Sequence, residues 1–366
     1  MTIDGVVRTR EPVRRDDDGP HMPGSLIEVI DAIPESCYTQ PTSRGLGLVA
    51  RDLAIYLAAI VALYFAHAWW LVGLLWLLTG FSIAGLFVLG HDAAHGALFA
   101  NRRLNGVIGR MLMLPSLHLF DAWKLGHNHI HHRHTTKQGM DFVWHPVTPA
   151  DYAEMSTTKR LVHRLEWSMF GAGAYYLRNI WLKRMMMFTP PAKWVRGIKR
   201  DRLLVTTVAT ITTFGVLVLG GLFSGDIFNA VWLVMKLLVV PFLLFGWIIG
   251  WTVYVHHIDP RIAWLRKGWT PVKAQLTGTT ILRVPKGFNF FFHWIFIHVP
   301  HHVDVRIPCY HLTRAAEAIK DAFPGIVAER KMRLSDYIRT TRACKLFDFD
   351  TGRWYSYRRG LATLKP

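Results

Sequence analysis

The chain has 366 residues, 51% of them hydrophobic, and its 43 Lys and Arg against 25 Asp and Glu give a formal net charge of +18. The three cysteines, Cys37, Cys309 and Cys344, are far apart and form no Cys-x-x-Cys pair, which argues against an iron–sulfur cluster, a thiolate zinc site or a disulfide framework in this chain. Excess positive charge suits nucleic acid, an anionic lipid surface or an acidic protein. Because no nucleic-acid-binding signature appears and the cations flank apolar segments, we expect no nucleic-acid partner, a lipid surface first and an acidic protein second.

The N-terminal residues are polar and charged and include the acidic cluster Asp16–Asp18. They lack the apolar stretch of a secretory signal peptide. We therefore expect residues 1–24 to form a disordered tail that stays in the cytoplasm.

The first apolar block runs from Leu53 to Gly90 and contains no Asp, Glu, Lys or Arg. As one helix it would be about 57 Å long at ~1.5 Å per residue, whereas one membrane crossing needs ~30 Å. Tryptophan favours the membrane–water boundary, and the segment His67–Trp70 lies at the midpoint of the block. The sequence therefore predicts two spans, at about residues 53–70 and 71–90, with a turn between them.

The second apolar block, residues 203–255, is divided by Ser224–Asp226. It predicts a second hairpin, with spans at about residues 203–224 and 227–255. Lys236 interrupts the last span, and we expect its ammonium group either to reach the membrane surface or to face a cavity.

Two hairpins return the chain to the same side of the membrane, so the segments 91–200 and 256–366 should meet there. The predicted fold class is an all-α integral membrane protein with two transmembrane hairpins, four spans in all, and a cytoplasmic, helical, His-rich cap. We divide it into a membrane domain at residues 25–340 and a C-terminal cytoplasmic tail at residues 341–366. Two shorter apolar stretches are expected to be interfacial or re-entrant: Leu104–Phe120 and Phe288–Ile297.

The chain has 19 histidines, and most of them are grouped. Three clusters lie beside the apolar blocks: His91 and His95; His127, His129, His131, His132 and His134; and His298, His301 and His302. A spacing of four residues places His91 and His95 on one helix face. The pair His256–His257 ends the second block, and His293 precedes the third cluster.

Imidazole is a ligand for iron, copper, zinc and nickel, and eight or more imidazoles exceed the needs of one ion. The clusters therefore predict a site for two metal ions at one face of the membrane. A metal transporter or sensor is the competing interpretation. Transporters place ionisable residues inside their spans, whereas these histidines lie beyond the span ends, which argues against that alternative.

The flanks of the clusters resemble the three histidine boxes of the membrane fatty-acid desaturase family, over roughly residues 45–315. The similarity is greatest to bacterial and cyanobacterial acyl-lipid desaturases of the methyl-end subgroup, which act near carbon 12. It rests on the following segments: Gly90–His95 with Phe99–Arg102 and Leu114–Pro115; Trp123–Lys137 with Asp141 and Trp144–Pro146; Val255–His257; and His298–His302 with Ile307–Tyr310.

One departure concerns the second box, which in that subgroup usually reads HxxHH. Here Ile130 lengthens the spacing from His127 to HxxxHH, which leaves open whether His127 or His129 is the ligand, and we favour His127. The resemblance implies the ligands His91, His95, His127, His131, His132, His257, His298, His301 and His302. Further ligands, or groups that hydrogen-bond the ligands, are expected among His129, His256, His293, His134, His145, Asp92 and Asp141.

The resemblance also implies the chemistry: a double bond introduced into an acyl chain, with two Fe ions as cofactor, O2 as co-substrate and electrons from an external donor such as ferredoxin. The substrate would be a membrane lipid or another acyl carrier. The expected location is a bacterial inner membrane, with the boxes and both termini cytoplasmic. Basic pairs that could contact the donor are Lys159–Arg160, Lys183–Arg184 and Arg196–Arg202, although a role in topology or lipid contact is the favoured reading of most of them.

A same-scaffold hydroxylase or ketolase acting on an alkane, acyl or carotenoid substrate is the alternative, because the boxes alone do not separate hydrogen removal from oxygen insertion. The flanking sequences favour a desaturase. An apolar channel for the acyl chain is expected beside the metal segments, with five aromatic candidates for its lining: Phe120, Trp123, Trp251, Phe292 and Trp294.

Overall fold

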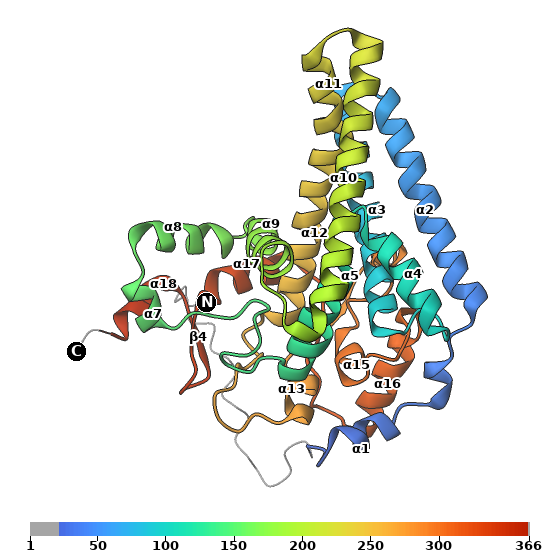
Figure 1. Cartoon of the computed structure of the whole chain (residues 1–366). Helices are drawn as coiled ribbons and strands as arrows, with labels where there is room; N and C mark the ends of the chain where they lie inside the picture. The colour runs from blue at the N-terminus through green and yellow to red at the C-terminus, as the bar shows by residue number, and fades with distance from the viewer. Residues whose placement is uncertain (1–21, 365–366) are drawn as a thin grey trace.

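The computed structural model describes residues 22–364, so nearly all of the expected N-terminal tail lies outside the described residues. Long helices stand together as a tower above a broad cap of short helices and loops (Figure 1). The cap contains both ends of the described chain, beginning with α1 (Leu26–Asp31) and ending with α18 (Tyr357–Ala362). The predicted all-α membrane fold is confirmed, with a few short strands added in the cap.

The first hairpin of the tower consists of α2 (Thr42–Phe65) and α3 (Trp69–His95), so the chain turns at residues 66–68. Helix α2 begins well before the expected start at residue 53 and includes the charged pair Arg51 and Asp52. Both charges are satisfied: Arg51 pairs with Asp52 at 2.6 Å and donates to the Phe290 carbonyl. An ion pair of this kind lets a helix continue through charged residues at a membrane boundary.

The second hairpin consists of α10 (Val195–Ser224), followed by one long helical segment made of α11 (Ile227–Val234), the π-helical turn η5 (Met235–Val239) and α12 (Val240–His257). Lys236 Nζ donates hydrogen bonds to the carbonyls of Tyr64 and Ala66 at 3.2 and 2.5 Å. It therefore caps the carbonyl end of α2, where a positive charge is favoured, beside the turn that the sequence places at the membrane surface.

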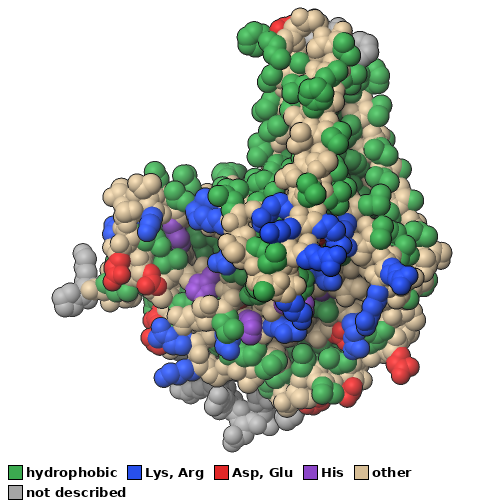
Figure 2. Space-filling model, viewed as in Figure 1, with side chains coloured by type: hydrophobic (Ala, Val, Ile, Leu, Met, Phe, Trp, Pro, Cys, Tyr) green, Lys and Arg blue, Asp and Glu red, His purple; other side chains and the backbone are tan. Residues whose placement is uncertain are grey.

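Four helical segments are long and apolar enough to cross a membrane, and the chain is an integral membrane protein. The best spanning windows of α3 and α12 are 56% and 44% buried, against 17% and 11% for α2 and α10. Helices α3 and α12 pack against each other as the inner pair. Figure 2 shows apolar side chains covering the tower and Lys and Arg side chains gathered at its foot and on the cap. The inner pair therefore carries its histidine-bearing ends into the cap.

The part of the cap below the tower is built from short elements. They are η1 (Glu35–Tyr38), α4 (Arg102–Met113), α5 (Phe120–Trp123), η2 (Lys124–His131), α6 (His132–His134), α13 (Pro271–Thr277), β1 (Ile281–Arg283), α14 (Phe288–Phe292), α15 (His298–Val303), η6 (Cys309–His311), α16 (Leu312–Ala322) and β2 (Glu329–Lys331). Strands β1 and β2 pair in parallel. The two short apolar stretches contribute α4 and α14, and α4 exposes Val107 and Met111.

A side lobe completes the cap. Its elements are α7 (Pro149–Glu154), α8 (Thr157–Glu166), α9 (Ala172–Tyr175), η3 (Tyr176–Met186), η4 (Ala192–Trp194), α17 (Leu334–Ala343), β3 (Leu346–Asp348), β4 (Arg353–Tyr355) and α18. The boundary expected at residue 341 falls inside α17, and Cys344, Leu346 and Phe347 beyond it are fully buried. The segment after residue 341 is thus folded against the lobe. The three cysteines, all within the described part, are free and buried.

Candidate metal centre

Two groups of imidazoles meet where the inner helices enter the cap. The first group is His91, His95, His127, His132 and His301, and the second is His131, His257 and His302. Within each group, one nitrogen from every ring lies within 4.8 Å of the others. The three clusters and the end of α12 therefore converge at one place, although they are far apart in the sequence.

The first group is built on the last turn of α3. The rings of His91 and His95 are 4.7 Å apart, and the ring of His301 on α15 is 4.6 Å from that of His91. His127 Nε2 lies 2.8 Å from His91 Nε2 and 3.1 Å from His132 Nε2. The nitrogens of four segments thus point at a common centre.

Several of these nitrogens have no hydrogen-bond partner within the described residues: both of His95, Nδ1 of His132, and Nε2 of His131, His301 and His302. A buried polar atom without a partner costs free energy, and a buried group of this kind calls for a ligand. Burial also lowers the pKa of His127, His132 and His301 well below the usual value, so these rings are neutral and keep a lone pair. Convergent neutral imidazoles fit metal ions.

The second group is held from outside. Asp141 Oδ1 accepts a hydrogen bond from His131 Nδ1 at 2.9 Å, and Gln275 Oε1 accepts from His302 Nδ1 at 3.0 Å. The Gly278 carbonyl accepts from His257 Nδ1 at 3.3 Å. Such partners fix the tautomer and leave Nε2 to face a metal.

Three further predicted residues lie next to these groups. The His298 ring stacks on that of His256 at 3.9 Å and lies 4.7 Å from that of His302, and its Nδ1 donates to the Ile295 carbonyl. Asp92 accepts hydrogen bonds from His91 Nδ1 at 3.3 Å and from the backbone N–H of Cys309 at 2.9 Å. The geometry makes Asp92 a support for His91.

Other predicted residues lie outside both groups. His129 turns away and its ring contacts Trp194 at 5.1 Å, so the structure brings His127 rather than His129 into the first group. His134 lies against Trp269, and His145 Nε2 accepts from the Gly139 N–H. His293 is fully buried and bonds Asp52 at 2.6 Å, which ties α2 to the cap.

The lengthened second box is accommodated by the helix that carries it. Residues Lys124–His131 form a π-helix, whose hydrogen bonds span one residue more than those of an α-helix. Because the turn is wider, His127 and His132 still reach the same centre. The HxxxHH spacing therefore brings the same kinds of ligand together as a tighter box would.

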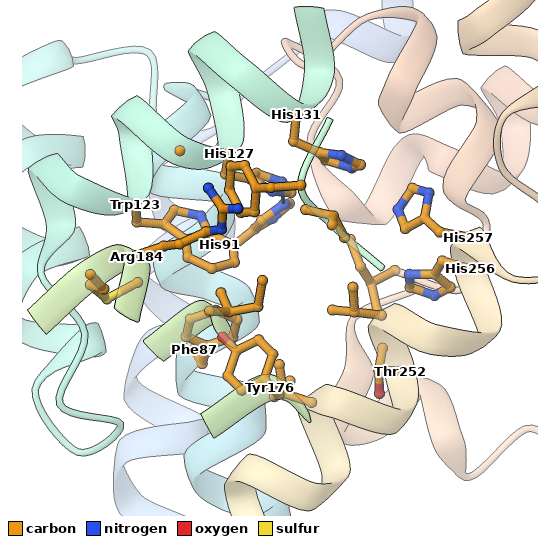
Figure 3. Close-up of a pocket in the computed structure, with 18 of the residues that line it drawn as sticks. Phe87, His91, Trp123, His127, His131, Tyr176, Arg184, Thr252, His256 and His257 are labelled. Carbon is orange, nitrogen blue, oxygen red and sulfur yellow. Dashed lines mark hydrogen bonds between the residues drawn. The ribbon is translucent and has the colours of Figure 1, made fainter. Parts of the chain in front are cut away.

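A narrow, largely apolar cavity with about 60 Å³ of free volume adjoins the histidines. Figure 3 shows the histidines in an arc around the cavity, from His91 and His127 through His131 to His257 and His256, with Phe87, Tyr176 and Thr252 closing its lower side. Of the five aromatic residues expected to line a channel, only Trp123 does so. Trp251 and Phe292 instead pack on Phe296 in the core, and neither Phe120 nor Trp294 borders the cavity.

Comparison with known sequences agrees with this geometry. Residues 68–333 match the model of the family described as fatty acid desaturase. The chain belongs to the fatty acid desaturase family. It is thus a fatty-acid desaturase and an oxidoreductase, as the sequences flanking the boxes predicted.

Relatives of this desaturase include an sn-1 oleoyl-lipid 12-desaturase of Anabaena variabilis, 27% identical over 89% of this chain and 91% of the relative. An sn-1 acyl-lipid omega-3 desaturase (ferredoxin) of Synechocystis is 29% identical over 82% of this chain and 81% of its own length. A temperature-sensitive sn-2 acyl-lipid omega-3 desaturase (ferredoxin) of Arabidopsis thaliana is 30% identical over 88% and 73%. The similarity therefore covers the tower and most of the cap.

The structure adds residues of the desaturase that sequence reasoning missed. His118 Nδ1 donates to the Ser116 carbonyl at 2.7 Å, so its Nε2 accepts from the Tyr176 hydroxyl at 2.8 Å, and this fixes the Tyr176 ring on the cavity wall. Burial lowers the pKa of His118 to about 3. Gln275 was also missed, and Arg184, expected only as a possible contact for the donor, borders the cavity. An isolated His or Gln carries no motif, so only the fold identifies these residues.

Proposed function

We propose that this desaturase is a membrane di-iron enzyme that uses O2 and external electrons to introduce a double bond into the acyl chain of a membrane lipid, at a position close to carbon 12. The observation that carries the proposal is the pair of convergent, neutral imidazole groups on the wall of an apolar cavity. The names of the 12-desaturase relatives support the position.

The proposed ligands are the five histidines of the first group for one ion and the three of the second group for the other. His298 and His256, stacked beside the second group, complete the set. Imidazole ligands without thiolate suit iron. When bound, two irons supply the oxygen-dependent oxidation of an unactivated C–H bond, which no protein side chain provides.

The chain's own residues hold and shield the site. Asp141 and Gln275 orient the rings of His131 and His302. Phe87, Trp123 and the Tyr176 ring present apolar surface that holds an acyl chain against the histidines and keeps bulk water out. The proposal needs no protein nucleophile or acid–base pair.

The proposed orientation puts the cap and both termini in the cytoplasm, at the inner membrane of a bacterium. It is supported by the cations on the cap, because cytoplasmic segments next to spans carry an excess of Lys and Arg.

Fatty-acid profiling of an expressing host tests the function. Cells fed oleate should accumulate a diene, and the position of the new double bond separates a 12-desaturase from an omega-3 desaturase. The His301→Ala variant, produced to the same level, should make none. Hydroxylated or ketonised lipids alone would instead support the hydroxylase or ketolase alternative.

Metal analysis of the purified protein tests the proposed di-iron centre. We expect about two irons per chain, the number that the two groups can hold. One exchangeable zinc and no iron would contradict a di-iron enzyme.

A further inference from the structure

The helix that carries the second histidine box has two chemically different faces. Within Lys124–His134, the side chains of His127, His131 and His132 point to the metal groups, whereas Arg133 is exposed and His129 turns to Trp194. The outer face of this helix is thus a direct cover of the proposed metal site.

Four cations surround this cover, and we name them the basic collar: Lys124, Arg133, Arg184 and Lys193. Lys124, Arg133 and Lys193 all act electrostatically on the His129 ring, which places them around it. Arg184 lies over the Phe142 ring at 4.6 Å, and that ring borders Gly126 on the same helix. Arg184 also reaches the edge of the cavity on the side of Trp123 and His127 (Figure 3).

No ion pair with a carboxylate is found for the four collar cations among residues 22–364, and what sets them apart from other unpaired cations of the cap is their place around the metal-binding helix. By contrast, Arg110 and Arg200 pair with Asp121 and Asp201, and Arg178 pairs with Glu166. Figure 2 shows Lys and Arg side chains with His side chains surfacing between them on the cap, below the apolar tower. Unpaired positive charge on one face attracts an anionic partner and speeds its association.

We propose that the basic collar is the docking surface for a small acidic protein that carries one electron. This inference rests on the proposed function, which requires external electrons, and it names where they enter. Two features favour a protein over lipid phosphates. Lys124, Arg133 and Arg184 lie on cap elements, with Lys193 alone at the foot of α10, and the collar surrounds the metal-binding helix. The Trp194 and His129 rings, 5.1 Å apart, join the surface to that helix. Relatives with ferredoxin in their names are consistent with such a partner.

The electron balance sets the number of dockings. Formation of one double bond removes two hydrogen atoms from adjacent methylenes, which supplies two electrons and two protons. Two carrier molecules, docking one after the other, supply two more electrons, and solvent supplies two more protons. Together they reduce one O2 to two water molecules, so each turnover needs two encounters with the collar.

A charge-reversal variant tests the surface without touching a proposed ligand. Lys124→Glu with Lys193→Glu changes two collar residues and leaves Arg133, which neighbours His132, in place. The control is Arg353→Glu with Arg358→Glu, exposed cations of β4 and α18 in the side lobe. Both variants change the net charge equally.

With a reduced soluble [2Fe–2S] ferredoxin as donor, we expect the collar variant to raise the KM for ferredoxin about tenfold at low salt, with kcat little changed. The control should stay within about twofold of the wild type. Iron content and single-turnover desaturation with dithionite should be the same in all three proteins. Those two readouts show that the collar variant is folded and loaded.

Direct binding separates failure of the inference from failure of the proposed function. Binding of labelled ferredoxin to the detergent-solubilised protein can be measured by fluorescence anisotropy. The affinity should be lower only for the collar variant, whether or not the wild type desaturates. Equal binding by the collar variant and the wild type would overturn the inference. So would a collar variant that keeps its ferredoxin KM and instead loses affinity for phosphatidylglycerol vesicles, because the collar would then be a lipid contact.

Discussion

The two histidine groups differ in what holds them. In the second group, Nδ1 of every ring is hydrogen-bonded, to Asp141, Gln275 or the Gly278 carbonyl. In the first group, His95 has no partner on either nitrogen within the described chain, and His91 and His127 contact each other directly. Three rings are therefore oriented before any ion arrives, while five are placed mainly by the helices that carry them.

The rings of the second group are therefore more strongly preorganised for an ion than the rings of the first group. A ring with a fixed tautomer loses little freedom when it binds an ion, whereas rings without outer partners become ordered by the ion itself. We expect the second group to bind its ion more tightly and the first group to exchange its ion faster.

Removing one ligand from each group gives the largest expected effect. His95→Ala and His302→Ala should each abolish diene formation, because both ions are needed. Each variant should also lower the iron content from about two to about one per chain. Elemental analysis measures this.

The exposed His67, in the turn of the first hairpin, provides the control, and His67→Ala should keep both irons and full activity. If either ligand variant loses all its iron, the groups form one cooperative site and the comparison fails.

Weakening an outer partner should have a smaller effect that depends on the group. Asp141→Asn leaves a neutral acceptor for His131 and should lower iron affinity in the second group about 10- to 100-fold. Asp92→Asn should cost less, because the 3.3 Å contact of Asp92 with His91 is longer. Titration of the metal-free proteins with ferrous ion measures both, and an equal loss would remove the proposed difference in preorganisation.

The pH dependence of His118 should affect the stability of the protein and leave its iron content and activity at neutral pH unchanged. Its pKa of about 3 lies below the usual ~6.5, so the unfolded chain takes up a proton that the folded protein excludes. The stability that His118 contributes is complete above pH 6.5 and is lost as the pH falls from there towards 3.

His118→Gln should therefore flatten the loss of stability below pH 6.5, by up to about 1.4 kcal/mol per pH unit, in thermal unfolding of the solubilised protein. Tyr176→Phe removes the hydroxyl but keeps the imidazole, so it should retain the wild-type slope. Identical slopes for His118→Gln and the wild type would mean that this imidazole does not titrate as its burial requires.

The sequence predicts the tower well because span length and charge exclusion are local properties. It also predicts which clusters meet, since two hairpins force both His-rich regions to one side. The start of α2 at Thr42 could not be predicted in this way. The helix includes the charged Asp52, whose buried partner His293 lies about 240 residues later in the chain. Long-range pairs of this kind appear only in the folded chain.

In the site, too, the sequence predicts what depends on local spacing and misses what depends on long-range contacts. The four-residue spacing of His91 and His95 predicted that they share one helix face, and the structure brings both together with His301. Gln275 and the Gly278 carbonyl could not be foreseen, because a backbone or amide acceptor has no sequence signature. The identity of the metal ligands stays a prediction until metal is measured.

The π-helix of the second box also bears on how such enzymes change length. A single inserted residue in an α-helix rotates everything beyond it, and would carry His131 and His132 off their face. Here the eight-residue π-helix Lys124–His131 provides wider turns, and His131 and His132 both face the histidine groups. We therefore expect deletion of Ile130 to be the best-tolerated deletion in this segment. Searches for such enzymes that demand a fixed motif length would overlook sequences like this one.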